Sequence, residues 1–370
     1  MQFIGIDLHT NKFTCSYRDE NTPPDAKKGN RTETFDLNDF GINKFIETLE
    51  AESYVLVEAT ITTFAFVRLI RLFVKNVFVA NTYELKQISQ ARNNTDKIDA
   101  NILSRTIKMQ VISGEQLISS VFVPPEDIQE LRALFSTYRL QKKQTTQIKN
   151  RIHSLLKEQL YGFTQEEIFD IRSREKIRNL QCGAALFFQL NQLFDLLEFI
   201  EAQVELLKEQ ILMQAAPYMR EIEIMTSMKG ISVFIAAAII ADIITVDRFK
   251  NSKHFTSYLR SAPKVSNSNT SERTKGINKK GRKLSSTLIS QSLNHVLEAS
   301  RRLSRWYENQ TENKKAGIVR TGLRRKVFTE IYKMLVKGEY HYAREEQKHK
   351  AKMSQYRNFL KKRKVLLEIA

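Results

Sequence analysis

The sequence contains little cysteine and no long hydrophobic run. Its only cysteines, Cys15 and Cys182, exclude a disulfide framework and a zinc site built from several cysteines. The longest apolar stretch, residues 233–244, is interrupted by Asp242 and is too short to span a bilayer. The first residues also lack a basic segment followed by an apolar one. We therefore expect a soluble, cytoplasmic protein with no membrane partner.

Acidic residues are scarce in the last third of the chain. The 370 residues carry 59 Lys and Arg against 41 Asp and Glu, a net charge of +18. Between Arg248 and Ala370 there are 31 basic and 9 acidic residues, a net charge of +22, whereas the rest of the chain has a net charge of −4. A basic face that only confers solubility is the alternative, but an excess of this size favours a phosphate-rich partner. We expect that partner to be a nucleic acid.

The N-terminal part alternates strand-like and helix-like segments. Residues 3–8 and 13–17 are separated by a short polar turn, which is typical of a hairpin. Further strands are expected at 32–35, 54–57 and 77–80. Helical spacing occurs over 39–49, over 64–73 and from 83 onward. The order predicts an α/β sheet that begins with an antiparallel meander.

The rest of the chain is predicted to be mainly helical. Apolar residues recur at alternating spacings of three and four from Leu190 to Ile211, which indicates a coiled-coil face. That face could pack within an antiparallel hairpin or form a dimerisation arm, and the two are compatible. Lys229 and Gly230, before an apolar helix, resemble a helix-hairpin-helix element. The fold class is α/β plus all-α, with three predicted parts: an α/β domain over 1–112, a helical coiled-coil arm over 113–221 and a basic helical domain over 222–370.

Four carboxylates of the N-terminal part lie at the ends of apolar elements. Asp7 and Glu58 each end a strand, and Asp96 and Asp99 share one face at the start of a helix. Alone, each has an ordinary role available, such as a turn cap, a surface acid or a helix N-cap. Carboxylates converging on one rim of a sheet suit Mg²⁺, and a pair of such ions about 4 Å apart supports phosphoryl transfer. Their joint placement predicts metal-dependent phosphate chemistry.

The segments around these carboxylates resemble a known family. Gly5-Ile6-Asp7-Leu8-His9, Val57-Glu58-Ala59-Thr60 and Thr95-Asp96-Lys97-Ile98-Asp99-Ala100 are similar to the signature of DEDD-type insertion-sequence transposases. Relatives in that family include Piv-type DNA invertases and bridge-RNA-guided recombinases. The resemblance implies a RuvC-like, RNase H-like fold and a cofactor of Mg²⁺ or Mn²⁺. It implies four catalytic metal ligands: Asp7, Glu58, Asp96 and Asp99.

The C-terminal part resembles the serine-bearing transposase domain of the same family. The similar positions are Gly230-Ile231, Tyr258-Leu259, Pro263 and Gly276-Ile277-Asn278-Lys279-Lys280-Gly281. The family serine lies five positions after the proline, which is Ser268 here, and Asn269 replaces the glycine that usually follows. Asn tolerates the left-handed conformation better than most residues. Ser266 and Ser271 remain alternatives. The resemblance implies that the serine hydroxyl attacks DNA and forms a covalent 5′-phosphoserine link.

Cations around the serine are expected to bind DNA phosphates without reading sequence. With Lys229 and Gly230, the predicted nucleic-acid contacts are Arg273, Lys275, Lys279, Lys280, Arg282 and Lys283. The resemblance implies double-stranded donor and target DNA, a guide RNA, and a homodimer that assembles into a tetramer. The serine segment contains one acidic residue, Glu272, so its metal ions must come from the N-terminal domain of the same chain or of a partner.

Three alternatives remain open from the sequence. Neither composition nor spacing shows an RNA, so a DNA invertase of the same fold without a guide is one of them. A hydrolytic nuclease of the Holliday-junction resolvase type would use the four carboxylates with water and no serine. A non-enzymatic nucleic-acid-binding scaffold would not need its carboxylates to converge. Covalent attachment to cleaved DNA distinguishes a recombinase from the last two.

Overall fold

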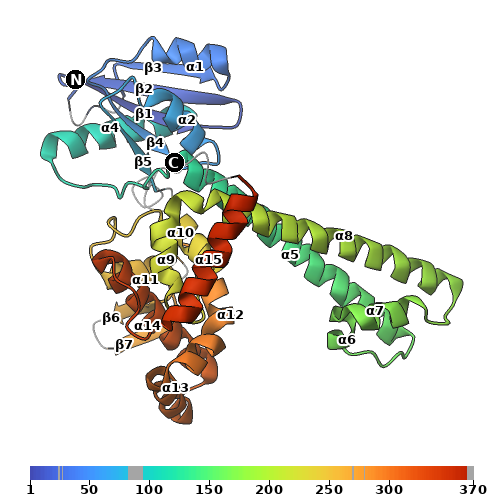
Figure 1. Ribbon diagram of the computed structural model, residues 1–370. Coiled ribbons are helices and arrows are strands. Elements are labelled where there is room, and N and C mark those ends of the chain that lie inside the picture. The colour runs from blue at the N-terminus through green and yellow to red at the C-terminus, as the bar shows by residue number, and fades with distance from the viewer. Residues whose placement is uncertain (24–25, 27, 82–94, 269–270, 279, 365–370) are drawn as a thin grey trace. The chain divides into compact units, whose positions relative to one another are not determined.

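The computed structural model describes residues 1–23, 26, 28–81, 95–268, 271–278 and 280–364 (Figure 1). Only the backbone is described for residues 169, 264–268 and 271–275. The chain forms two compact units, residues 1–124 and 125–370. The three-part division expected from the sequence stays a prediction. No helix in the described ranges is long and apolar enough to cross a membrane.

The N-terminal unit is built on a five-stranded mixed sheet with the strand order β3-β2-β1-β4-β5. Its strands are β1 (Gln2–Leu8), β2 (Lys12–Asp19), β3 (Arg31–Asp36), β4 (Tyr54–Glu58) and β5 (Asn76–Ala80). The first three strands are antiparallel, and β4 runs parallel to β1 and β5. The predicted α/β sheet is therefore confirmed. The helix expected from residue 83 begins outside the described residues.

Helices cover both faces of this sheet. Successive side chains of β1 point alternately to the two faces, so each contacts the helices on one face only. The helices are α1 (Asp39–Ile46), α2 (Thr63–Ile70) and α4 (Asp96–Ser113). Ile4 and Ile6 belong to the core that contains Phe45 of α1 and Phe66 of α2. Phe3 belongs to a second core with residues of α4. Because successive side chains of a strand point to opposite faces, Gly5 and Asp7 face α4 together with Phe3.

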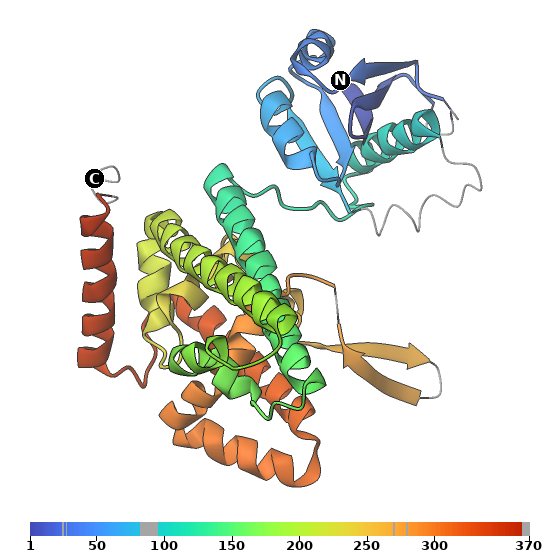
Figure 2. The ribbon, with the colours of Figure 1, turned by 90° about the vertical axis from the view of Figure 1, so that its right-hand side faces the viewer.

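The second unit is mainly helical (Figures 1 and 2). Its first elements are α5 (Glu126–Glu158), α6 (Gln165–Phe169), α7 (Ile171–Arg178), α8 (Ala184–Gln214) and a 3-10 turn (Ala216–Tyr218). Then follow α9 (Met219–Thr226), α10 (Val233–Ile243), α11 (Ser252–Tyr258), β6 (Pro263–Ser268) and β7 (Ser271–Ile277). The last elements are α12 (Leu284–Ala299), α13 (Arg301–Asn313), α14 (Ala316–Lys337) and α15 (Glu346–Lys362).

Helices α5 and α8 form a long hairpin arm, with α6 and α7 at its tip (Figure 1). Leu190, Leu197 and Val204 of α8 belong to one buried cluster with Ile152 and Leu156 of α5. The apolar repeat of α8 therefore packs within the chain, because the hairpin gives its seam an intramolecular partner. A dimerising role of the arm stays a prediction.

The core of the second unit surrounds α10, in which every residue from Ala236 to Ile243 is buried. Helices α5, α8, α9 and α12 pack against it. The polar stretch 261–283 contains the antiparallel hairpin of β6 and β7, which projects from the helices in Figure 2. A mixed sheet followed by a mostly helical remainder agrees with the fold class expected from the sequence.

Candidate metal centre

Asp7 and Glu58 occupy equivalent positions near the ends of two neighbouring parallel strands. Ile6 of β1 pairs with Val57 of β4 in parallel register, and the two acids are the next residues on each strand. Leu56 belongs to the core formed with α4, so alternation places Glu58 on the α4 side of the sheet as well. Asp7 is buried and Glu58 is partly buried. The sheet thus directs two carboxylates toward the start of α4.

Helix α4 begins where the other two carboxylates stand. Thr95 caps it, because its side chain accepts a hydrogen bond from the backbone N–H of Ile98. The alternative of Asp96 as the N-cap is therefore wrong, since Thr95 already occupies that position. Asp96 and Asp99 are both in the first helical turn, where the positive end of the helix dipole favours acids. Their carboxylates are left available for other contacts.

A glycine allows α4 to lie directly on β1. A Cβ atom at Gly5 would be 2.1 Å from the backbone nitrogen of Ser104 and 2.2 Å from the carbonyl oxygen of Ala100. No side chain fits in that space, so the two backbones touch. Gly5 is two residues before Asp7 on the same face of β1. This close approach brings the first turn of α4 to the carboxylate of Asp7.

Two basic side chains near the turn between β1 and β2 contact the carboxylates. The Nε2 atom of His9 is 3.0 Å from Oδ2 of Asp7 and 3.2 Å from Oδ1 of Asp96. The Nζ atom of Lys12 is 3.1 Å from Oδ2 of Asp96. His9 and Lys12 were not predicted as site residues from the sequence. The available signal was that His9 follows Asp7 in the turn and Lys12 begins β2, because a hairpin returns the chain to the same rim.

Burial and neighbouring charges shift the pKa values of the three aspartates. Burial raises the pKa of Asp7; nearby His9 lowers it, and Asp99 and Asp96 raise it further. Burial and then the charge of Asp96 raise the pKa of Asp99. The hydrogen bond from Lys12 lowers the pKa of Asp96. Repulsion between like charges disfavours full ionisation of such a group, and a bound cation would relieve it.

The donor set fits a divalent metal ion. One ligand atom each from Asp7, His9 and Asp96 lie within 4.8 Å of one another. Carboxylate oxygens are the ligands of Mg²⁺ and Mn²⁺, and an imidazole nitrogen suits transition-metal ions. Asp99 is coupled electrostatically to this group, and Glu58 stands on the adjacent strand. The structure therefore brings Asp7, Asp96 and Asp99 together and directs Glu58 to the same face.

The predicted serine lies in the β6–β7 hairpin of the second unit. Ser268 and Ser271 are the last paired residues of the two strands, and Ser266 pairs with Arg273. The side chains of these residues and of Lys275 are outside the described part, as is Lys279 altogether. At the level of the backbone, the hairpin places Ser268 beside the tip.

Two predicted nucleic-acid contacts have structural partners. The Nζ atom of Lys229 is 3.3 Å from Oε1 of Glu345. Gly230 has a positive φ of 90°, and a Cβ atom there would be 2.7 Å from the side chain of Val296 in α12. Close packing on α12 and the positive φ thus explain why residue 230 is a glycine. Arg282 and Lys283 directly precede α12, and Lys280 follows the β6–β7 hairpin. A nucleic-acid role for all of them stays a prediction.

Comparison with protein families gives two matches in the chain. A DEDD transposase model named for IS110 matches residues 4–160, which include all four carboxylates. The model of the transposase IS116/IS110/IS902 family matches residues 222–308, which include the β6–β7 hairpin. A comparison with curated proteins found no match.

Proposed function

The chain belongs to the IS110 family of DEDD transposases, enzymes that cleave and rejoin DNA, and on this premise we propose that it recombines DNA through a serine nucleophile. The proposal rests on one observation above all. One ligand atom each from Asp7, His9 and Asp96 lie within 4.8 Å of one another at one rim of the sheet, and the charges of Asp96 and Asp99 both raise the pKa of Asp7. Burial of Asp7 beside like charges is unfavourable, and such arrangements are concentrated at functional sites.

In this proposal Asp7, Glu58, Asp96 and Asp99 hold Mg²⁺ or Mn²⁺ on an RNase H-like sheet. Such an ion, when bound, stabilises negative charge on phosphate oxygens and lowers the pKa of a nearby hydroxyl. His9 orients the carboxylates of Asp7 and Asp96 through its two short contacts. Lys12 favours the ionised form of Asp96, because its hydrogen bond lowers the pKa of that residue. Partners of this kind fix the geometry of metal ligands.

The proposed nucleophile is the hydroxyl of Ser268. Its oxygen attacks the phosphorus of a DNA phosphodiester, forms a 5′-phosphoserine ester and releases the 3′-hydroxyl of the cleaved strand. The 3′-hydroxyl of a second strand then attacks the phosphoserine, which restores the serine and completes strand exchange. No bond energy is lost to water, so the exchange needs no ATP. The backbone position of Ser268 near the tip of a projecting hairpin supports this role.

We further propose that the active site is shared between subunits of a homodimer that pairs into a tetramer on two DNA duplexes. The carboxylates belong to the unit 1–124 and Ser268 to the unit 125–370. Two separate compact units allow the serine of one subunit to serve the metal centre of another. A guide RNA that pairs with both DNAs would supply sequence recognition, because phosphate contacts alone read no sequence.

Covalent trapping tests the serine mechanism. The test substrate is DNA from the ends of the insertion sequence that encodes the protein. With this DNA and Mg²⁺, we expect a covalent protein–DNA adduct that survives denaturing electrophoresis. Ser268→Ala should abolish the adduct, and Ser266→Ala and Ser271→Ala are matched controls from the same hairpin that should retain it. Asp7→Asn should also abolish it. Full cleavage by Ser268→Ala without any adduct would instead identify a hydrolytic nuclease.

Complementation tests the shared site. Ser268→Ala and Asp7→Asn are each expected to be inactive, and a mixture of the two should restore adduct formation if the serine acts on a partner's metal centre. A mixture as inactive as either variant, under conditions where the two proteins co-assemble, contradicts the shared site.

A further inference from the structure

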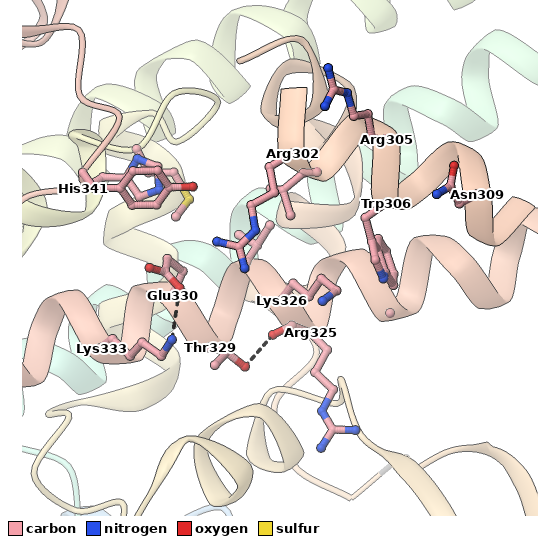
Figure 3. Close-up of a pocket in the computed structure, with 15 residues that line it drawn as sticks. Arg302, Arg305, Trp306, Asn309, Arg325, Lys326, Thr329, Glu330, Lys333 and His341 are labelled. Atoms are coloured by element: carbon pink, nitrogen blue, oxygen red, sulfur yellow. Dashed lines mark hydrogen bonds and ion pairs between the residues drawn. The ribbon is translucent and has the colours of Figure 1, made fainter. Parts of the chain in front are cut away.

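Helices α13 and α14 of the second unit line a groove with a volume of about 980 Å³ (Figure 3). The cationic side chains of its lining are Arg302, Arg305, Arg325, Lys326 and Lys333. Glu330 is the single carboxylate of the lining, and its Oε2 atom is 3.5 Å from Nζ of Lys333. Among the residues that the structure describes, no acid pairs with the other four cations. The groove therefore has a positive potential available to a ligand.

Aromatic rings lie among these cations. Trp306 of α13 is partly exposed in the lining, with Nζ of Lys326 at 4.6 Å from its ring centroid. Tyr342 is 70% exposed, and its ring centroid is 4.3 Å from that of His341. Figure 3 shows Arg302 and Lys326 between His341 and Trp306. The groove thus alternates flat rings with cationic groups.

Local structure is adapted to the position of the indole ring. A Cβ atom at Gly322, inside α14, would be 3.1 Å from Cη2 of Trp306. Glycine in a helix interior is destabilising relative to alanine, so this contact gives Gly322 a reason to be there. No residue of α13, from 301 to 313, is buried. Trp306 packs against the core with only part of its surface, so the indole is held in place while the rest of it stays exposed in the groove.

A ligand for this groove must be anionic and must offer flat groups. Guanidinium and ammonium groups bind phosphates, and aromatic side chains stack on bases. The bases of a duplex are already stacked and paired, so their faces are out of reach, whereas unpaired bases are free to stack. We propose that the groove binds an unpaired stretch of nucleic acid, with phosphates on Arg302, Arg325 and Lys326 and a base against Trp306. This deepens the proposed function, and rests on it for the presence of a nucleic-acid partner.

The only tryptophan of the sequence lies in the groove, so fluorescence excited selectively at tryptophan, beyond the absorption of tyrosine, reports on this site. We expect short unpaired RNA and unpaired DNA of the same sequence to quench Trp306 to saturation in the full-length protein. Duplex DNA and polyglutamate at the same ionic strength should quench it far less. Stronger quenching by RNA or by DNA then assigns the source of the strand, and either ranking supports the groove.

Substitutions separate stacking from charge. Trp306→Leu should weaken binding of the unpaired probe about ten- to hundredfold, measured by anisotropy of a labelled oligonucleotide. Trp306→Tyr keeps an aromatic ring and should retain most of the affinity. Arg302→Ser should weaken binding, whereas Arg301→Ser removes the same charge one residue away, outside the groove lining, and should not. Circular dichroism checks that each variant folds.

Three results would overturn the inference: no quenching by unpaired probes, equal quenching by duplex or polyglutamate, or unchanged affinity in both Trp306→Leu and Arg302→Ser. The outcome is separate from that of the serine mechanism. Quenching is expected to persist in Asp7→Asn, in which no covalent adduct forms. If the protein forms the adduct but its tryptophan is not quenched, the proposed function stands and the groove has no part in it.

Discussion

At Gly5 a single hydrogen atom in place of a side chain sets the distance between β1 and α4. Gly5→Ala would push a methyl group against the backbone of Ser104 and Ala100 at 2.1 and 2.2 Å. Backbone cannot rotate away as a side chain can, so we expect a loss of at least about 2 kcal/mol in the free energy of unfolding of the N-terminal unit. We also expect weaker metal binding, because the first turn of α4 carries Asp96 and Asp99.

Urea denaturation followed by circular dichroism measures the loss of stability. The same experiment with Mn²⁺ measures metal binding, because an ion that binds the folded protein raises the free energy of unfolding. Gly317→Ala is the matched control, since a Cβ atom at Gly317 meets nothing within 4 Å. That variant should be as stable as the original protein or more so. Unchanged stability and unchanged metal protection in Gly5→Ala would show that α4 is not held in place by this contact.

The same residues show how far sequence predicts a site. Asp7 and Glu58 could be predicted because each ends an apolar strand, and parallel neighbours end at one rim. The turn after Asp7 pointed to His9 and Lys12, but their contacts with Asp96 could not be predicted, because they join residues distant in sequence. The role of Gly5 was hidden for the same reason, since it depends on the register of α4 over β1.

At the scale of elements, long periodic helices were the easiest to predict and short polar ones the hardest. The heptad-like spacing between Leu190 and Ile211 predicts α8 and its buried seam. Helix α13 (Arg301–Asn313) has no such repeat, because its partly buried apolar residues, Leu303, Trp306 and Tyr307, span little more than one turn. Tertiary packing on α12 and α14 supplies what the local pattern lacks.

Helix α8 also carries an apolar face that the hairpin leaves uncovered. Phe188, Phe199 and Leu206 are 65%, 62% and 58% exposed, and their spacing places them on one side of the helix, opposite the buried seam. If the arm mediates the proposed self-association, Phe199→Glu should weaken it at least about tenfold, because a charge would be desolvated at the contact. Folding should be unaffected, since the side chain is exposed.

Sedimentation velocity over a concentration series measures this weakening. Gln189→Glu is the matched control, because it adds the same charge to an exposed position of α8 away from the apolar face. Equal self-association of the original protein and of Phe199→Glu would place the subunit contact elsewhere. Equal weakening by both variants would indicate a general charge effect.

At the scale of the whole molecule, charge and chemistry are divided along the sequence. The acids of the candidate metal centre lie in a part of the chain with a net charge of −4, and residues 248–370 carry +22. If the carboxylates were surrounded by many Lys and Arg side chains, their pKa values would fall, but these cations would also compete with the metal ion for the carboxylate oxygens. Separation lets one part bind phosphates tightly while the other keeps its carboxylates free for a cation.

This division predicts where the salt dependence of DNA binding originates. Each phosphate neutralised on duplex DNA adds about 0.9 to the slope of log affinity against log salt concentration. Replacing Lys280 and Lys283 with Gln should therefore reduce the slope by about 1 to 2, measured by anisotropy at several salt concentrations.

Lys142 and Lys143 of the arm are exposed as well, and the same replacement there removes equal charge and should leave the slope unchanged. Asp7→Asn, measured without divalent metal ions, should leave the slope unchanged too, because Asp7 carries no positive charge that could neutralise a phosphate. An equal loss of slope in the arm variant would mean that the DNA senses the total charge of the chain, and the basic third would lose its special role.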